Sequence, residues 1–583
     1  MQRRAYPYPE QAAILLIMAL LLCLCADWGL PGRQSLALLT HDAPLSGQQK
    51  RDLTSQREEF YDRLDASRRA QADNMVSRLA ARKGVSLGEW GEVPESEMTP
   101  AQKITAFRAY LLGSMASDER GTYRALSRIN PAAWDFDPKF YVYGGAYLYP
   151  AGALIYLGKL TGLIQVSRDL AWYLDHPEHM ARIHLAGRGL NIAAFLGVLV
   201  LLALWGRRLG SRALGTLAML AWALSPLPWW DALASKPHVY AAFWGLGGLF
   251  LLDGHARHGR KWRVWLAGAA LGMAMGSSLP AAVLALAFPV FLYRPGGAWP
   301  WLRLCLAGWL AMLALFFLTN PYAILSHQVY LLTLVEHLFG KGWGYGVFNF
   351  NNLRDYFFLL ALRDFAFPFM LVALPALIWQ AFRPAAPLRR LALLLALLLP
   401  VWSLTVSSVG IGAFLTAPLC VLAGWAMRDI FLGKAWAPPA LRGALLALCL
   451  LPGLVSLPAQ VWAAVAAKEP HASLSQQLEA GGLPPEASIG LFEPPDSVRL
   501  PPFPFINRRI VIIKNWREEE APPDLVLVNQ RELEHHWPGH PLKPLYEEAG
   551  WAGSPPWPDF VKNIVSFLPE RTRNHILIFR RKP

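Results

Sequence analysis

The sequence predicts a polytopic α-helical membrane protein with about eleven spans, followed by a small α/β domain outside the membrane. Three observations lead to this class. Only 16% of the 583 residues are charged, whereas soluble domains carry about 25%. The mean hydropathy is +0.27, and apolar runs of roughly membrane length recur up to about residue 465. From about residue 468, short apolar runs alternate with Pro, Asn and Asp, a pattern typical of short strands.

The formal net charge of +14 does not predict a nucleic-acid partner. Much of the basic excess lies in short loops between apolar runs, where it indicates membrane orientation. The 24 tryptophans fit the same class, because indole rings favour the membrane–water interface. All five cysteines lie in apolar runs, so we expect no disulfide and no cysteine zinc site in the external segments.

The first element is an apolar run that follows a basic N-terminus and reaches about residue 30. No small-x-small cleavage site closes this run, so we interpret residues 1–30 as a signal anchor and first span. Residues 31–184 then form a long external segment. Within it, residues 48–83 are either an amphipathic arm or, preferably, a solvated helical insertion. Residues 151–164 are too short to span and are expected to form a helix in the interface.

Residues 185–467 form the expected transmembrane core, in which ranges of high hydropathy predict the helices. These ranges are 185–205, 214–230, 239–252, 264–293, 302–318, 356–379, 391–406, 411–427 and 441–465. The range 264–293 is broken between Gly276 and Pro280, so two short helices should return the chain to the side it came from. The basic loops all fall on one side, which the positive-inside rule makes cytoplasmic. The N-terminus is then inside, and the external segment and residues 468–583 are outside.

The acid pair Asp118 and Glu119 stands in the external segment, just before an expected helix. One carboxylate there could act as a general base on an acceptor hydroxyl or amine, or hold a divalent cation. The same position also suits a plain helix N-cap, although adjacent residues point to different helix faces and cannot both cap well. The residues alone leave the two interpretations open.

A family resemblance adds to this interpretation. The run DERGTYRALSRINPAAWDFDPKFYVYGGAYLYP, which begins at Asp118, resembles the first external loop of GT-C glycosyltransferases. It is most similar to bacterial family 39-type proteins, which are related to protein O-mannosyltransferases and to the lipid A aminoarabinose transferase. The runs LSPLPWWDALASKPHVYAAFW and TNPYAILSHQVY resemble later parts of the same family. The resemblance covers roughly residues 1–465.

The resemblance implies a GT-C-like fold in a bacterial inner membrane. It also implies transfer of a sugar from a polyprenyl-phosphate donor to an acceptor on the outer face, where the acceptor is a protein, a lipid or a glycan. Asp118 would be the catalytic carboxylate, and Glu119 is assigned to the catalytic site with it. The family also has an arginine ahead of the span that follows the interfacial helix, here Arg182 or Arg188.

Five further residues are assigned to the substrate site. Lys236 and His238 lie at the external mouth of an expected span and suit the negative charge of the leaving lipid phosphate. The ordinary alternative for Lys236 is an interfacial lysine that snorkels. Asp231 is interpreted as a supporting acid or as a helix-end residue. Tyr143 and Tyr149 belong to the tyrosine-rich segment that leads into the interfacial helix.

The run from His176 to His184, with Glu178 and His179, has a spacing that a metal ion could use. We favour interfacial histidines, because no second set of ligands accompanies the run, and we name no metal ion as a cofactor. A divalent cation at the acid pair is left as an option. The loop 337–356, rich in glycine and aromatic residues, is either a lid that stacks on sugar or part of the aromatic belt.

The alternative function is a non-enzymatic transporter or flippase of lipid-linked saccharide. Such a protein should carry ionisable residues within its spans and show repeat symmetry. Here the notable acids lie outside the expected spans, and the sequence shows no internal repeat. The glycosyltransferase is therefore the favoured hypothesis.

Overall fold

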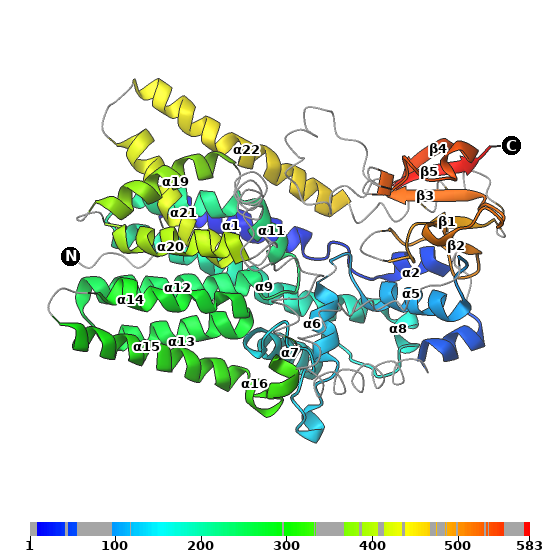
Figure 1. The fold of residues 1–583 in the computed structure, drawn as a ribbon, viewed down its shortest axis with the longest axis horizontal. Coiled ribbons are helices and arrows are strands. Elements are labelled where there is room, and N and C mark those ends of the chain that lie inside the picture. The colour runs from blue at the N-terminus through cyan, green and yellow to red at the C-terminus, as the bar shows by residue number, and fades with distance from the viewer. Residues whose placement is uncertain are drawn as a thin grey trace.

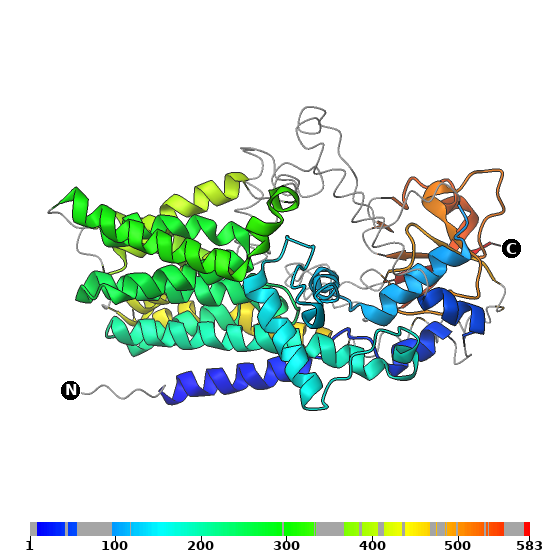
Figure 2. The same ribbon diagram turned by 90° about the horizontal axis from the view of Figure 1, so that it is seen from below.

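In the computed structural model, a bundle of long helices lies at one end of the molecule and a β-sheet at the other, with shorter helices between them (Figures 1 and 2). The structure describes residues 8–40, 45–54, 96–116, 118–293, 297–331, 367–383, 387–405, 413–433, 438–466, 487–496, 500–529, 536–552 and 576–582, with a few isolated positions between these ranges. The loop 337–356 lies outside the described residues, as does the segment 48–83 beyond residue 54.

Four helices among the described residues are long and apolar enough to cross a membrane. They are α9 (Pro177–Arg208), α15 (Ala298–Thr319), α21 (Ala413–Met427) with the π-helical turn that extends it to Leu432, and most of α22 (Pro439–Ala466). The chain is therefore an integral membrane protein, as the hydropathy predicted. Shorter apolar helices accompany these four, and the total of about eleven spans stays a prediction.

The other helices of the bundle follow the hydropathy of the sequence. They are α1 (Pro9–Cys25), α10 (Arg212–Ala223), α11 (Pro226–Ala232), α12 (His238–His258), α13 (Trp262–Ser277), the 3-10 helix η2 (Leu279–Leu286), α14 (Ala287–Leu292), α19 (Phe367–Phe382) and α20 (Arg389–Thr405). The expectation of one continuous helix over 214–230 was wrong, because this range forms α10 and α11. The chain breaks at Ser225, since a residue before proline avoids helical dihedrals and Pro226 suits the first turn of a new helix.

The expected break after Gly276 is present, and the chain does turn back there. α13 and α15 lie side by side and run in the same direction. Gly268 of α13 packs closely on the backbone of Gly308 in α15, and one turn later Gly272 packs on the backbone of Met312, so the residue numbers rise together along both helices. Since the two helices run parallel, η2 and α14 must return the chain to the end where α13 began.

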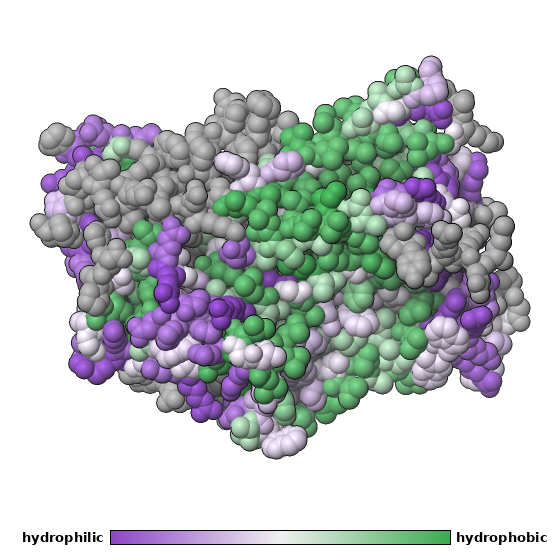
Figure 3. All heavy atoms as spheres, turned by 180° about the vertical axis from the view of Figure 1, so that it is seen from behind, coloured by the Kyte–Doolittle hydropathy of each residue, from purple (hydrophilic) through white to green (hydrophobic). Residues whose placement is uncertain are grey.

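The basic loops gather at the end of the bundle farthest from the sheet, where α1 also begins (Figure 1). Arg208 and Arg257 approach the Asp253 carboxylate at 3.6 and 3.0 Å, and Arg212 forms an ion pair with Glu10 at the start of α1. Figure 3 shows a broad apolar surface over the bundle, flanked by hydrophilic side chains at both ends. This pattern suits a membrane crossing, and the cytoplasmic position of the basic end stays a prediction.

The expected C-terminal α/β domain contains a five-stranded mixed sheet. Its strands are β1 (Ile489–Leu491), β2 (Ile510–Ile512), β3 (Leu525–Asn529), β4 (Tyr546–Ala552) and β5 (Ile576–Arg581), in the order β2-β1-β3-β5-β4. The strands β2, β1 and β3 are parallel, whereas β5 pairs antiparallel with both β3 and β4. The short apolar runs of the sequence supply the buried strands, because the described side chains of β1, β2 and most of β3 are buried.

The sheet shares its core with two helices from the N-terminal part of the chain. The helices α2 (Arg33–Thr40) and α5 (Pro100–Leu112) contribute Leu39 and Phe107 to the same buried cluster as Ile489 of β1. Glu97 also forms an antiparallel bridge with Val511 of β2. Two segments that are far apart in the sequence therefore build one domain, whose core neither of them completes alone.

Candidate active site

The acid pair lies at the start of α6 (Glu119–Leu126), in the group of short helices between the bundle and the sheet. Asp118 occupies the N-cap position, but its side chain makes no capping hydrogen bond. Its side chain is 37% exposed, whereas that of Glu119 is fully buried. The two adjacent carboxylates therefore have different surroundings, as expected for neighbours that point to different faces of a helix.

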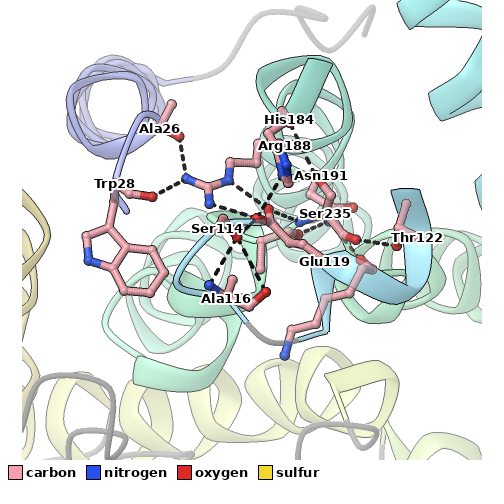
Figure 4. Close-up of polar contacts among 12 residues, drawn as sticks. Ala26, Trp28, Ser114, Ala116, Glu119, Thr122, His184, Arg188, Asn191 and Ser235 are labelled. Carbon is pink, nitrogen blue, oxygen red and sulfur yellow. Dashed lines mark hydrogen bonds and ion pairs between the residues drawn. The ribbon is translucent and has the colours of Figure 1, made fainter. Parts of the chain in front are cut away.

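The Glu119 carboxylate accepts hydrogen bonds from Arg188, Ser235 and Ser114. Arg188 of α9 donates from Nε to Oε1 at 2.7 Å and from Nη2 to Oε2 at 2.9 Å, in a two-point ion pair. The backbone N–H of Ser235 donates to Oε1 at 2.7 Å, and the Ser114 hydroxyl donates to Oε2. The His184 ring lies 3.3 Å from Oε2. Figure 4 shows these groups converging on the Glu119 carboxylate.

Arg188 links this carboxylate to the end of the first helix. Its Nη1 donates to the carbonyl oxygens of Ala26 and Trp28, at 2.7 and 2.6 Å (Figure 4). Burial alone would raise the pKa of the Glu119 carboxyl, but the charge and hydrogen bonds of Arg188, with His184, hold that pKa well below its usual range. Glu119 is therefore ionised and buried, and together with Arg188 it connects α6 to α9 and to the end of α1.

The sequence left the choice between Arg182 and Arg188 open, and the structure separates them. Arg188 holds Glu119, whereas Arg182 donates to the Leu163 carbonyl oxygen at 3.0 Å. His184 and Arg188 are four residues apart, so they lie on the same face of α9. This four-residue spacing at the start of an apolar helix is the signal in the sequence that could have indicated the pair.

Lys236 lies in the short connection between α11 and α12, and it reaches the exposed acid. Its ammonium Nζ is 3.4 Å from Asp118 Oδ2 and 2.8 Å from Asp231 Oδ1. The Lys236 side chain is 6% exposed and that of Asp231 1%, so Asp118 is the most exposed member of the three. The second oxygen of Asp231, Oδ2, has no hydrogen-bond partner among the described residues.

Side chains of α6 and α9 hold the connection that carries Lys236. The Thr122 hydroxyl donates to the Ser235 carbonyl oxygen at 2.6 Å, and the Tyr123 hydroxyl lies 2.5 Å from the Ser235 hydroxyl. From α9, the Asn191 side-chain amide donates to the Lys236 carbonyl oxygen at 2.7 Å. Since these bonds are made to backbone atoms or to small hydroxyls, the sequence contains no motif for them.

The remaining expected site residues are divided between two places. His238 is the first residue of α12, and its ring meets that of Tyr143 edge to face at 6.3 Å. Both side chains are buried, and His238 follows Lys236 by two residues in the sequence. Tyr149 instead belongs to α7 (Gly145–Leu160), and its hydroxyl donates to the Phe136 carbonyl oxygen at 3.3 Å. Tyr149 therefore has its hydrogen-bond partner in the loop that follows α6.

The histidine-rich run does not form a metal site within the described part of the chain, where no group of three or more His, Cys, Asp or Glu side chains is suited to a metal ion. His184 lies in the Glu119 network instead. His179 accepts a hydrogen bond from the Gln165 backbone at 3.0 Å, and His176 lies 3.8 Å from Glu178.

The sheet domain contacts the acid-bearing helix directly. Arg120, the residue after Glu119, forms an ion pair with Asp496 in the loop that follows β1. Nearby, the Tyr110 hydroxyl donates to the Leu500 carbonyl oxygen at 3.0 Å. The sheet domain therefore touches the start of α6, two residues away from Asp118.

The variant Asp496→Asn is expected to loosen α6. A partly buried ion pair contributes about 1 kcal/mol, so amide hydrogen exchange over residues 119–126 should become about 5-fold faster. A matched control is Glu97→Gln, which removes an exposed ion pair with Arg509 in the same domain and should leave α6 unchanged. Unchanged exchange in the Asp496 variant would show that the sheet domain does not restrain α6.

No protein-family model and no curated protein matches this chain. Among solved structures, the chain is similar to ArnT from Cupriavidus metallidurans bound to undecaprenyl phosphate, with 13% identity, coverage of 82% of this chain and 96% of that chain, and a TM-score of 0.41. It is also similar to the archaeal oligosaccharyltransferase AglB from Archaeoglobus fulgidus in complex with an inhibitory peptide and a dolichol-phosphate. There the identity is 13%, the coverage 58% of this chain and 50% of that chain, and the TM-score 0.37. At these values neither likeness assigns the chain to a family.

Proposed function

We propose that the chain is a family 39-like membrane glycosyltransferase, which moves a sugar from a polyprenyl-phosphate donor to an acceptor on the outer face of the membrane. The observation that carries this proposal is the approach of Asp118 Oδ2 to Lys236 Nζ, at 3.4 Å across 118 residues of sequence. A carboxylate and a cation at one place supply the two charges that the reaction needs. The resemblance of the run that begins at Asp118 supplies the reaction class.

In the proposed reaction, an acceptor hydroxyl or amine attacks the anomeric carbon of the donor sugar. The bond between that carbon and the phosphate oxygen breaks, and the lipid phosphate leaves with the bonding electrons. Asp118 takes the proton of the acceptor and orients it for attack, because its carboxylate is the exposed one of the acid pair. The configuration at the anomeric carbon is inverted by this single displacement.

Lys236 offsets the negative charge of the leaving phosphate. The buried Asp231 carboxylate, 2.8 Å away, holds the ammonium in position. Glu119 acts as a positioning residue rather than a catalytic one, because its buried oxygens accept from Arg188, Ser235 and Ser114. Tyr143 and His238 line the approach to Lys236 in this proposal, and no metal ion is assigned to the site.

The proposal is tested with a labelled polyprenyl-phosphate sugar and membranes that contain the full chain. The variant Lys236→Met is expected to raise KM for the donor about 10- to 100-fold, because a charge-assisted contact with phosphate contributes about 1.5–3 kcal/mol. The single change leaves the buried Asp231 carboxylate without its cation. The double variant Lys236→Met with Asp231→Asn removes that unpaired charge, and it should show the same rise in KM. The matched control is Lys159→Met, which changes an exposed lysine on α7.

An unchanged KM in the folded double variant would contradict the role of Lys236. Movement of intact lipid-linked saccharide across the membrane, without transfer of the sugar, would contradict the enzyme and support the flippase alternative.

A further inference from the structure

The loop that follows α6 presents two large apolar side chains to the outside of the molecule. Trp134 is 84% exposed and Phe136 is 37% exposed, and their rings meet edge to face at 6.2 Å. In Figure 1 this loop projects sideways from the long helices, below α6 and next to α16 (Tyr322–Leu325). Side chains of this size are usually buried in a protein core or in contact with another apolar phase.

The loop is held in one shape rather than left to fluctuate. Asn130 and Asp135 exchange two backbone hydrogen bonds, at 2.7 and 3.1 Å, which close the turn around Trp134. Trp134 itself has a left-handed backbone, with φ of 55°, which is rare for a bulky residue. The turn therefore holds the exposed indole in place at some conformational cost.

Two hydrogen bonds fix the loop against the bundle at a known depth. The Phe136 N–H donates to the Tyr322 hydroxyl at 3.2 Å, and the Tyr149 hydroxyl of α7 donates to the Phe136 carbonyl oxygen. Tyr322 lies three residues beyond Thr319, the last residue of the membrane-length helix α15. The loop is therefore level with the end of a membrane-length helix, at the end of the bundle away from the basic loops.

The apolar surface of α15 continues to this loop. Its exposed side chains recur every three or four residues along one helix face, as expected for a side that faces lipid. They are Leu306, Leu310, Leu313 and Phe317, followed by Leu318 and, in α16, Ile324 and Leu325. The exposed Leu154, Leu157 and Leu160 form a second apolar face on α7. Trp134 and Phe136 thus lie where a lipid-facing surface reaches its polar boundary.

We propose that the loop 130–136 rests in the headgroup layer of the bilayer, with the rings of Trp134 and Phe136 inserted among the lipids. Indole favours this layer, because its ring is apolar while its N–H can bond to water or headgroups. Because α6 leads directly into the loop, this contact sets the depth at which Asp118 meets the membrane surface. The proposal concerns placement in the membrane and does not depend on the chemistry at Asp118.

The test measures the depth of position 134 in liposomes. The five native cysteines are replaced by alanine, and a nitroxide spin label is attached to Trp134→Cys in the full chain. Collisions with oxygen, which dissolves in lipid, are compared with collisions with a water-soluble nickel chelate. Two matched labels calibrate the scale, Leu310→Cys on the lipid-facing side of α15 and Leu545→Cys on the sheet domain.

We expect the label at position 134 to collide with oxygen more than the Leu545→Cys label does, and with the nickel chelate severalfold less. Nickel collisions equal to those of the Leu545→Cys label would overturn the proposal. Dipolar broadening that disappears on dilution with unlabelled protein would also overturn it, because a second copy of the chain would then cover the loop. Since the side chain at position 134 is exposed, thermal denaturation should show that the labelled chain remains folded.

Discussion

Asp118→Asn is expected to slow sugar transfer by about 10²- to 10⁴-fold, which is the usual contribution of a general base. Asparagine keeps the size and shape of the side chain but cannot take the acceptor proton. The Lys236 ammonium stays in place beside Asp231, so donor binding should be largely retained. The expected result is therefore a large fall in kcat with little change in KM for the labelled donor.

The matched control is Asp175→Asn, which changes an exposed aspartate at the end of the short helix α8 (Trp172–Asp175). Its rate should equal that of the wild type. Asp118→Glu should recover part of the activity, since a carboxylate returns at an altered distance. A kcat within a few-fold of the wild type for Asp118→Asn would exclude this residue as the base. The role of Lys236 is tested separately by the KM of the Lys236→Met variant.

Arg188→Met is expected to lower the free energy of unfolding by about 3–5 kcal/mol, because it leaves the fully buried Glu119 carboxylate without its cation. The loss also frees the carbonyl oxygens of Ala26 and Trp28, so the end of α1 should loosen. The measurement is thermal denaturation of the purified protein in detergent. A matched control is Arg33→Met, whose exposed pair with Glu178 should contribute little.

The double variant Arg188→Met with Glu119→Gln should be less destabilised than Arg188→Met alone, because no buried charge is then left unpaired. The pH dependence provides a second check. The pKa of Glu119 is depressed in the folded protein, so its contribution to stability is present above the ordinary value of 4.5 and is lost as the pH falls through the depressed pKa. The stability difference between wild type and Glu119→Gln should therefore shrink as the pH is lowered. A constant difference would contradict an ionised Glu119.

Charge and hydropathy put Asp118 and Lys236 on the same expected side of the membrane, and in the structure their side chains lie 3.4 Å apart. The sequence did not separate the surroundings of Asp118 and Glu119, because burial is a property of the packed fold and adjacent acids look alike in a sequence. The His184 ring, weighed as a metal ligand, turned out to lie beside Glu119. Its four-residue spacing from Arg188 was the available clue.

The sequence by itself determined the membrane class, the broken helix after Gly276 and the short strands of the C-terminal domain, because each depends on hydropathy or proline and glycine chemistry within a short stretch. Only the tertiary structure decided that α2 and α5 complete the core of the sheet domain, and that Arg188 rather than Arg182 holds the buried acid. The bonds that bring Lys236 to Asp118 run through Ser235 and Thr122, whose backbone and hydroxyl partners leave no pattern in the sequence. Such contacts join segments about a hundred residues apart, and packing alone determines which of many equivalent polar groups meet.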